Sequence, residues 1–407
     1  METRNGQNNH WKRNFYTIAA GQAVSYVGSS AVQFALIWWL TKETGSALML
    51  SLAGIFAALP QTVLGPFAGV WVDRLKRKTV MIAADLFTGF VALAFAGAFF
   101  LGTPPYWAAC AVLGIRAIGG VFHYPALAAA MPLLVPREEL VRANSVNQFI
   151  FMGSFMLGPV IGAAMFAALP MEVILILDLA GALAACFTVG IIKIPELSRE
   201  VHEKKHFWRE MKEGVFVFLE NKKLFLLTVF STIVFVFIMP LSSLYPLMVT
   251  SFGGTEWHLS IVQIVYGAGM LAGAGITGGL GSRIKNKIGF SMSGLFIYSL
   301  TAFLCGIVPP NMTGLLLFGG ICFVMGTGNN IYSIPLTAYM QETIPNEKQG
   351  RAFSLYSCLM SVAMPLGLII AGPVAEYFGV AFFFIIAGLV SLVISAVCAL
   401  VIRKHTA

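Results

Sequence analysis

The segment Gly69-Val-Trp-Val-Asp73-Arg74-Leu75-Lys76-Arg77-Lys78 decides the fold class, because it places basic side chains in a short gap between two long apolar runs. The run before it ends near residue 72, and the run after it starts near residue 79. Each run has at least about 20 residues, the length that a helix needs to cross a bilayer. The segment therefore predicts a short basic loop between two membrane-spanning helices.

Further apolar runs of the same length follow along the whole chain. They bring the total to twelve, near residues 14–40, 47–72, 79–101, 106–130, 143–168, 173–193, 223–250, 259–281, 288–308, 314–335, 351–376 and 380–402. A chain of 407 residues that is 58% hydrophobic and 11% charged, with a mean hydropathy of +0.82, is not an ordinary soluble domain. We expect an all-α membrane protein with twelve transmembrane helices.

Basic residues are distributed unevenly between the two sides of this membrane. The termini and every second gap hold 24 of the 26 lysines and arginines, Lys42 lies in the other set of gaps, and Arg116 lies inside a run. By the positive-inside rule, both termini and the segment 194–222 are expected in the cytoplasm. The net charge of +8 then reflects loops beside membrane lipid, and no nucleic-acid partner is expected.

The longest polar stretch separates six runs from six. The sequence predicts a six-helix bundle over 1–193, a cytoplasmic linker over 194–222 and a second six-helix bundle over 223–407. Apolar side chains recur at helical spacing within the linker, at Trp208, Met211, Val215 and Phe218. They favour an amphipathic helix along the inner membrane surface over a plain tether.

A weak internal repeat relates the two halves at an offset of about 209 residues, so that residues 278–287 correspond to residues 69–78. Ser282 stands where the first segment has Asp73. Repeats of this kind build the two bundles that rock about a central site in many secondary transporters. The repeat therefore predicts a transporter that works by alternating access.

The basic segment also fits G-x-x-x-D-R-x-x-R-K, the loop signature of the major facilitator superfamily. Gly69 would allow close helix approach, and Asp73 would cap the next helix or pair with a cation of the neighbouring bundle. Arg74, Arg77 and Lys78 would anchor the loop at the cytoplasmic side. A plain positive-inside loop is the alternative interpretation.

Two further stretches resemble motifs of the same superfamily. Leu113-Gly-Ile-Arg116-Ala-Ile-Gly119-Gly120 resembles R-x-x-x-G, and Gly158-Pro159-Val-Ile-Gly162 resembles the G-P-x-x-G core associated with exporters. In the second motif, proline and glycine would let the fifth span bend and pack closely where the two halves seal.

An arginine near the bilayer centre costs about 2.5–3.5 kcal/mol on insertion scales, so Arg116 should face a wet cavity or an acidic partner. Asp85 is the candidate partner, because the third and fourth spans adjoin in sequence. A structural ion pair and a proton-coupling element both fit this pattern.

The other intramembrane polar residues are Gln22, Gln33, His123, Asp178, Asn329 and Asn330. Asp178 lies about six residues from the outer end of its span, where an isolated carboxylate is costly and titratable. It is the chief candidate for proton coupling, with a helix-to-helix hydrogen bond as the alternative. His123 is expected to be structural.

Nothing in the sequence predicts a cofactor or a metal site. The six cysteines lie in the apolar runs without a C-x-x-C pattern, which favours packing roles. The glycines at 267–281 lack a following Gly-Lys-Ser/Thr, so ATP is not expected to supply the energy. Pairs such as Gly269/Gly273 and Gly275/Gly279 have the spacing of closely packed helices.

Over nearly its whole length the chain resembles macrolide-efflux transporters within a family of drug:proton antiporters. The matching stretches are Phe15-Tyr-Thr-Ile18, Gly21-Gln-Ala-Val-Ser25, Leu40-Thr41, Thr44-Gly-Ser-Ala47, Val72-Asp-Arg74, Ala84-Asp-Leu86, 116–127, Pro132-Leu-Leu-Val-Pro136, Arg209-Glu-Met211, Arg351-Ala-Phe-Ser-Leu355 and Ala363-Met-Pro-Leu-Gly-Leu368. The resemblance implies proton-driven export of a macrolide such as erythromycin across a bacterial cytoplasmic membrane, by a protein that functions as a monomer.

Other functions remain open from the sequence. A siderophore or lipid exporter of the same superfamily is the main alternative, in which an anionic cargo would prefer Arg116 and be repelled by Asp178. A non-transporting membrane sensor or scaffold is another, although the chain has no sizeable soluble domain. An enzyme is not expected, because the polar residues supply no nucleophile, base and orienting group together.

Overall fold

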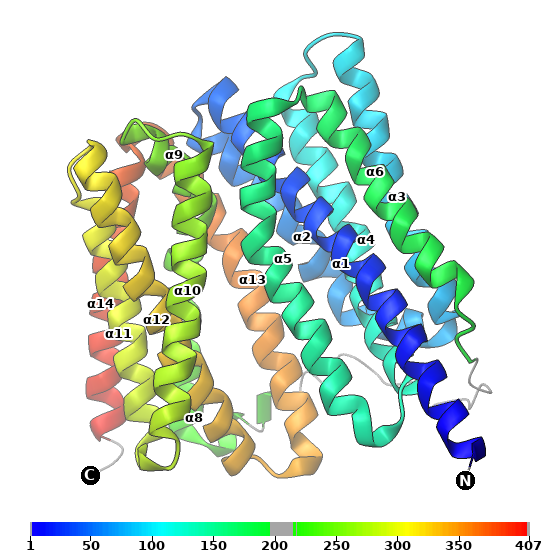
Figure 1. Ribbon diagram of the computed structural model, residues 1–407. Coiled ribbons are helices and arrows are strands. Elements are labelled where there is room, and N and C mark those ends of the chain that lie inside the picture. Colours follow the sequence, from blue (N-terminus) through cyan, green and yellow to red (C-terminus); the bar gives the residue numbers. More distant parts are fainter. Residues whose placement is uncertain (1, 196–214, 217, 405–407) are drawn as a thin grey trace. The chain divides into compact units, whose positions relative to one another are not determined.

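The computed structural model describes residues 2–195, 215–216 and 218–404. The helices of this part of the chain are α1 (Glu2–Thr44), α2 (Ala47–Arg74), α3 (Arg77–Phe100), α4 (Tyr106–Leu134), α5 (Leu140–Ala168), α6 (Met171–Ile191), α8 (Lys222–Ile238), α9 (Pro240–Ser251), α10 (Glu256–Leu280), α11 (Lys287–Gly306), α12 (Met312–Thr343), α13 (Asn346–Phe378) and α14 (Val380–Lys404) (Figure 1). Two short 3-10 helices, η1 (Arg137–Glu139) and η2 (Gly281–Arg283), precede α5 and follow α10.

The described helices include twelve segments long and apolar enough to cross a membrane. This confirms the predicted number of transmembrane helices. The seventh segment, Lys222–Ser251, contains both α8 and α9, which are separated at Met239 directly before Pro240. The tenth segment is α12, which continues past Pro335 to Thr343. The helix is therefore longer than the apolar run 314–335 from which it was predicted. Large apolar side chains such as Leu316 are widely exposed, as suits a protein whose solvent is lipid.

Side-chain caps explain where several of these helices begin. Asn221, Asn286 and Asn311 precede α8, α11 and α12, and each accepts a hydrogen bond from the backbone N–H three residues later, at 2.9–3.1 Å. At the start of α10, Thr255 and His258 form a reciprocal capping box. Such caps satisfy N–H groups that the first turn of a helix leaves without a partner.

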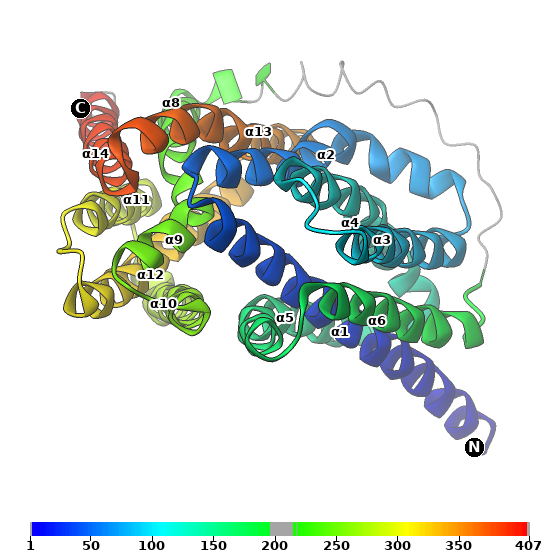
Figure 2. The same cartoon turned by 90° about the horizontal axis from the view of Figure 1, so that it is seen from above.

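The residue contacts divide the chain into two compact units, one of residues 1–44 and 56–202 and one of residues 45–55 and 203–407. In the first unit, α1 packs on α5 and α6, and α3 packs on α4 and α6. In the second, α8 packs on α13 and α14, and α11 packs on α12 and α14 (Figure 2). For these four pairs the corresponding spans have the same neighbours in both units, as the internal repeat predicts, whereas α10 packs on α12 without an equivalent packing of α2 on α4.

The boundary between the predicted halves stays a prediction, because most of the linker 194–222 lies outside the described residues. The predicted amphipathic helix lies largely outside them as well, and the structure shows only that residues 215–216 and 218–220 are helical.

The first residues of α2 pack within the second unit. Glu376 at the end of α13 accepts hydrogen bonds from the Ser46 hydroxyl at 2.9 Å and the Leu48 backbone N–H at 3.0 Å. The carboxylate therefore caps the N-terminus of α2, where a negative charge is favourable. One helix turn earlier on α13, Gly372 lies so close to α2 that an added Cβ would be 2.9 Å from the Ser51 Cβ.

Glycines bring α10 and α12 together in the second unit. A Cβ added at Gly269 or Gly273 would collide with the carbonyl oxygen of Phe323 or Thr327, so the predicted packing role of this pair is confirmed. At Gly275 and Gly279, an added Cβ would meet no described atom within 4 Å. Their spacing alone was therefore a misleading signal.

Candidate functional site

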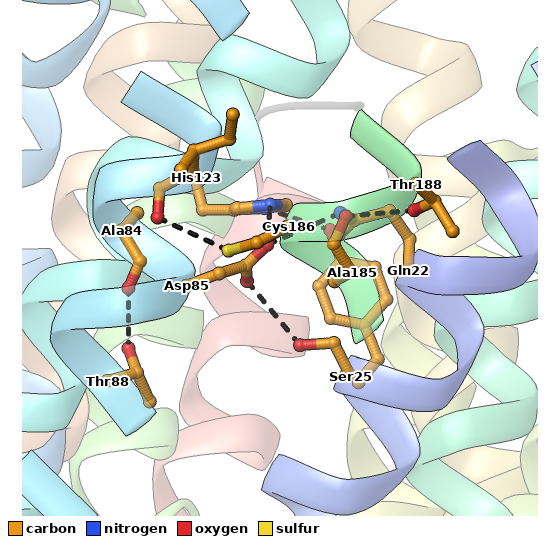
Figure 3. Close-up of polar contacts among 11 residues, drawn as sticks. Gln22, Ser25, Ala84, Asp85, Thr88, His123, Ala185, Cys186 and Thr188 are labelled. Carbon is orange, nitrogen blue, oxygen red and sulfur yellow. Dashed lines mark hydrogen bonds and ion pairs between the residues drawn. The ribbon is translucent and has the colours of Figure 1, made fainter. Parts of the chain in front are cut away.

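A buried carboxylate on α3 is the centre of the first polar layer in the first unit. Asp85 Oδ2 lies 3.4 Å from Gln22 Nε2, and Oδ1 accepts a hydrogen bond from the Ser25 hydroxyl at 3.4 Å. The Nε2 atom of His123 on α4 lies 3.4 Å from the same Oδ2 atom. Figure 3 shows the carboxylate lying among these side chains of α1 and α4. All four residues are buried.

The other ring nitrogen of His123 faces a tyrosine. The Tyr26 hydroxyl on α1 lies 3.3 Å from His123 Nδ1, and the two rings meet edge to face. The imidazole is therefore held between a carboxylate on one nitrogen and a hydroxyl on the other. We refer to Gln22, Ser25, Tyr26, Asp85 and His123 together as the Asp85 layer.

A second layer consists of Arg116 on α4, Asp178 on α6 and Ser29 on α1. Arg116 Nη1 lies 2.8 Å from Asp178 Oδ2, and the Ser29 hydroxyl donates to Asp178 Oδ1 at 3.0 Å. Both charged side chains are buried. We call this set the Arg116 layer.

The pairing differs from the one expected for Arg116, because the structure gives it Asp178 as its partner instead of Asp85. The reason lies in the spacing on α4. Arg116 and His123 are seven residues apart, about two helical turns, so they lie on one face at two different depths. His123 is level with Asp85 and Arg116 with Asp178. Asp178, expected as an isolated carboxylate, is thus already neutralised by a fixed cation.

Small residues allow the helices to meet at this depth. A Cβ added at Gly119 of α4 would collide with the Thr88 hydroxyl and lie 3.0 Å from the Ala84 carbonyl oxygen, both on α3. A Cβ at Gly89 of α3 would lie 2.9 Å from Leu179 of α6. The close approach of α3 to α4 and α6 therefore depends on glycine, and it brings Asp85 within reach of His123.

Both layers border a cavity of about 290 Å³ within the first unit. Its polar lining includes Ser25, Ser29, Asp85, Arg116 and His123. Aromatic side chains also line it, namely Tyr26, Tyr124 and Phe151. A cavity with one carboxylate beside aromatic faces suits an amphipathic cation, because rings and carboxylates both attract positive charge.

The asparagines predicted in the pathway lie in the second unit, on α12. Asn330 Nδ2 donates to the Met270 carbonyl oxygen on α10 at 2.7 Å, and the Ser333 hydroxyl donates to Asn330 Oδ1 at 3.3 Å. Asn330 thus ties α12 to α10. Its neighbour Asn329 is half-buried on the same helix.

The basic segment between α2 and α3 is described in part. Arg74 ends α2 and Arg77 begins α3, while the side chain of Asp73 lies outside the described residues. Lys78 Nζ donates to the carbonyl oxygens of Gly190 at 2.6 Å and Ile192 at 2.9 Å. Lys78 therefore anchors the start of α3 to the C-terminal carbonyl groups of α6, where a cation is favourable.

Gly69 lies in the same segment, and a Cβ added there would meet no described atom within 4 Å. Its expected role in close helix approach stays a prediction.

The G-P-x-x-G motif places its glycines against α1. A Cβ added at Gly158 would collide with the Ser30 side chain, and one at Gly162 would lie 2.6 Å from the Ala31 carbonyl oxygen. Pro159 lies between them, inside α5. The motif was expected to act where the halves seal, but the close contacts that it makes here are with α1, within the first unit.

Sequence reasoning missed Ser25, Tyr26 and Ser29, and interpreted His123 as a packing residue. A signal for them was present, since polar residues recur every three or four positions from Gln22 through Ser29 and therefore share one face of α1.

Comparison with known proteins identifies relatives of the whole chain. The family model described as Major Facilitator Superfamily matches residues 18–367 and 241–407. Macrolide efflux protein A of Streptococcus pyogenes is 38% identical over 400 residues, which cover 97% of this chain and 98% of that protein. Macrolide efflux protein A of Enterococcus faecalis is 37% identical over 326 residues, covering 80% of this chain and 100% of that protein.

Solved structures show the same fold. A bacterial homologue of the human lysosomal transporter Spinster, in an inward-facing and unoccupied conformation, superposes with a TM-score of 0.73. It is 13% identical, and the match covers 97% of each chain.

Proposed function

This chain belongs to the major facilitator superfamily, and we propose that it exports macrolide-type or other amphipathic cationic drugs in exchange for protons, by alternating access. It is a multi-pass protein of the bacterial cytoplasmic membrane and a transporter rather than an enzyme. Both termini and the basic loop 73–78 would lie on the cytoplasmic side, where the charge distribution of the sequence places them.

The observation that carries the proposal is the cavity beside Asp85. Among the described residues, Arg116 in the same lining is paired with Asp178, whereas the Asp85 carboxylate faces an imidazole and can accept a cationic amine. Tyr26, Tyr124 and Phe151 offer rings for the apolar body of the drug. The relatives named for macrolide efflux support the same cargo class. From the resemblance to macrolide-efflux transporters, we further propose that the protein works as a monomer.

The alternative, a siderophore or lipid exporter, requires a site for an anion. Arg116 is the buried cation that would serve it, but Asp178 already lies 2.8 Å away and balances its charge. Asp85 would repel an anionic cargo that entered the same cavity. These contacts favour a cationic cargo.

A panel of drugs and siderophores in a pump-deficient bacterial host tests the cargo class. Expression should raise the inhibitory concentration of erythromycin and lower its accumulation in the cells, while siderophore secretion stays unchanged. Asp85→Asn, produced at the same level, should lose this resistance. Siderophore export without any effect on drug accumulation would instead establish the alternative.

We also propose that the loop containing Gly69, Asp73, Arg74, Arg77 and Lys78 belongs to the inner gate. Asp73→Asn should leave the protein inserted in the membrane yet slow its cycling. Erythromycin efflux at the wild-type rate, with normal expression, would remove the gate assignment.

A further inference from the structure

We propose that the proton-binding site of this exporter is the Asp85–His123 pair, with His123 carrying the proton, and that Asp178 does not couple transport to protons. The inference rests on the proposed proton-driven export and assigns its coupling residues. It replaces the interpretation of Asp178 as the coupling carboxylate, which depended on that residue being isolated.

The charge balance of the buried residues leads to this assignment. Among the described residues of the first unit, the buried ionisable groups within the membrane are Asp85, Arg116, His123 and Asp178, apart from tyrosines and cysteines. Arg116 balances the charge of Asp178 in the structure. An ionised Asp85 has no such fixed partner, and an unpaired buried carboxylate is costly unless His123 is protonated, a cation binds or the carboxyl group itself takes up a proton.

The groups that face His123 from the surrounding helices leave it as the group that can change charge. Tyr26 comes from α1, Asp85 from α3 and Cys186 from α6, while α4 itself adds Tyr124 and, two turns away, Arg116. From α5, Phe151 lines the same cavity without a titratable group. Tyrosine and cysteine are ordinarily neutral near pH 7, whereas histidine changes charge close to that pH.

The geometry allows the imidazole to exist in both protonation states. When neutral, it can donate from Nε2 towards Asp85 and accept from the Tyr26 hydroxyl at Nδ1. When protonated, Nδ1 donates to the Tyr26 oxygen after the hydroxyl rotates. In both states each ring nitrogen faces a polar atom, and a small approach of Nε2 to Asp85 Oδ2 would complete the hydrogen bond that is absent at 3.4 Å.

Proton and drug would then exchange at one carboxylate. Asp85, His123 and Tyr26 all line the cavity, so a cationic amine that enters can approach Asp85 directly. Once the amine neutralises Asp85, the positive charge on His123 is no longer balanced, and its proton passes to water in the cavity. Asp178, by contrast, is not among the cavity-lining residues.

Proton release on drug binding tests the assignment directly. Purified wild-type protein, in weak buffer with a pH indicator dye, should release protons when erythromycin is added. His123→Gln should reduce this release at least tenfold at saturating drug. His258→Gln is the matched control, since His258 is half-buried at the third position of α10, where glutamine can also form the capping box. It should release protons as wild type does.

A ligand-free measurement covers the case in which the protein binds no erythromycin. Infrared difference spectra between pH 5 and pH 8 should contain imidazole bands that are lost in His123→Gln and kept in His258→Gln. Asp85→Asn gives a variant that retains the histidine. It removes the negative charge that faces Nε2, so the protonated imidazole should become less stable and its infrared transition should move to lower pH.

The outcomes separate the inference from the proposed function. Absence of erythromycin binding by wild type would contradict the proposed drug export, and the infrared titration would still decide whether His123 titrates. Undiminished proton release by folded His123→Gln would overturn the inference, as would the absence of a His123 band. If His123→Gln does not fold, an unshifted imidazole transition in Asp85→Asn overturns it instead.

Discussion

Arg116 Nη1 lies 2.8 Å from Asp178 Oδ2, and the two side chains form a buried ion pair between α4 and α6. A pair of this kind contributes no net charge to the site while both groups are ionised. It therefore leaves the neighbouring Asp85 and His123 as the groups whose charge depends on protons or on a bound cation.

Removing one member of this pair should destabilise the first unit. Asp178→Asn leaves the buried guanidinium uncompensated, a loss of about 3–5 kcal/mol in comparable sites. The apparent melting temperature of the purified variant should fall clearly below that of wild type.

The double variant Arg116→Met/Asp178→Leu removes both charges and should recover much of the lost stability. A single Asp178→Asn variant as stable as wild type would show that the ion pair contributes nothing to the fold.

The G-P-x-x-G motif offers a test with a control on the same helix. Gly158→Ala adds a Cβ that collides with Ser30 on α1, whereas an added Cβ at Gly153, also on α5, meets no described atom within 4 Å. Gly158→Ala should cost about 1–3 kcal/mol through overpacking and should reduce transport.

Gly153→Ala should be neutral or slightly stabilising, because alanine is the better helix former. Both variants should insert into the membrane. Thermal unfolding measures the change in stability, and a drug-efflux assay measures the change in transport. Equal behaviour of the two would mean that contact with α1 is not what requires Gly158.

The anchor between α3 and α6 should be visible in amide exchange. Lys78→Gln removes an ammonium group that donates to Gly190 and Ile192, and the loss of these charge-assisted bonds should cost about 1 kcal/mol at this partly exposed site. Hydrogen exchange near residues 188–192 should accelerate. Lys285→Gln, at an exposed lysine in the corresponding loop of the second unit, should leave that region unchanged. If amide exchange near residues 188–192 is not faster in Lys78→Gln, Lys78 does not anchor α3 to α6 and contributes only to the surface charge.

Hydropathy predicted the twelve membrane-spanning helices, because each span is long, apolar and bounded by polar gaps. The pairing of Arg116 could not be predicted in this way. Adjacency in sequence pointed to Asp85, but depth along the helix axis decides which charges meet, and a difference of two turns on α4 assigns Arg116 to Asp178. The partners of His123 depend on how α1 and α3 pack against α4, which short motifs do not encode.

The cap at the start of α2 gives a further prediction. Glu376→Ala removes the carboxylate that accepts hydrogen bonds from Ser46 and Leu48, so exchange of the backbone amides near residues 47–50 should become faster. Glu376→Gln keeps an acceptor and should show a smaller effect. Glu172→Ala, in the first turn of α6, controls for the loss of an acidic side chain elsewhere. If the backbone amides at the start of α2 exchange as slowly in Glu376→Ala as in wild type, the carboxylate does not have this role.

Transport into proteoliposomes under an imposed pH gradient tests the central claim most directly. Wild-type protein should concentrate erythromycin against its gradient only when protons flow in the opposite direction. Folded His123→Gln should lose this uphill transport while still exchanging erythromycin downhill. Equal erythromycin accumulation with and without the pH gradient in the wild type, or uphill transport by His123→Gln equal to that of wild type, would contradict the account.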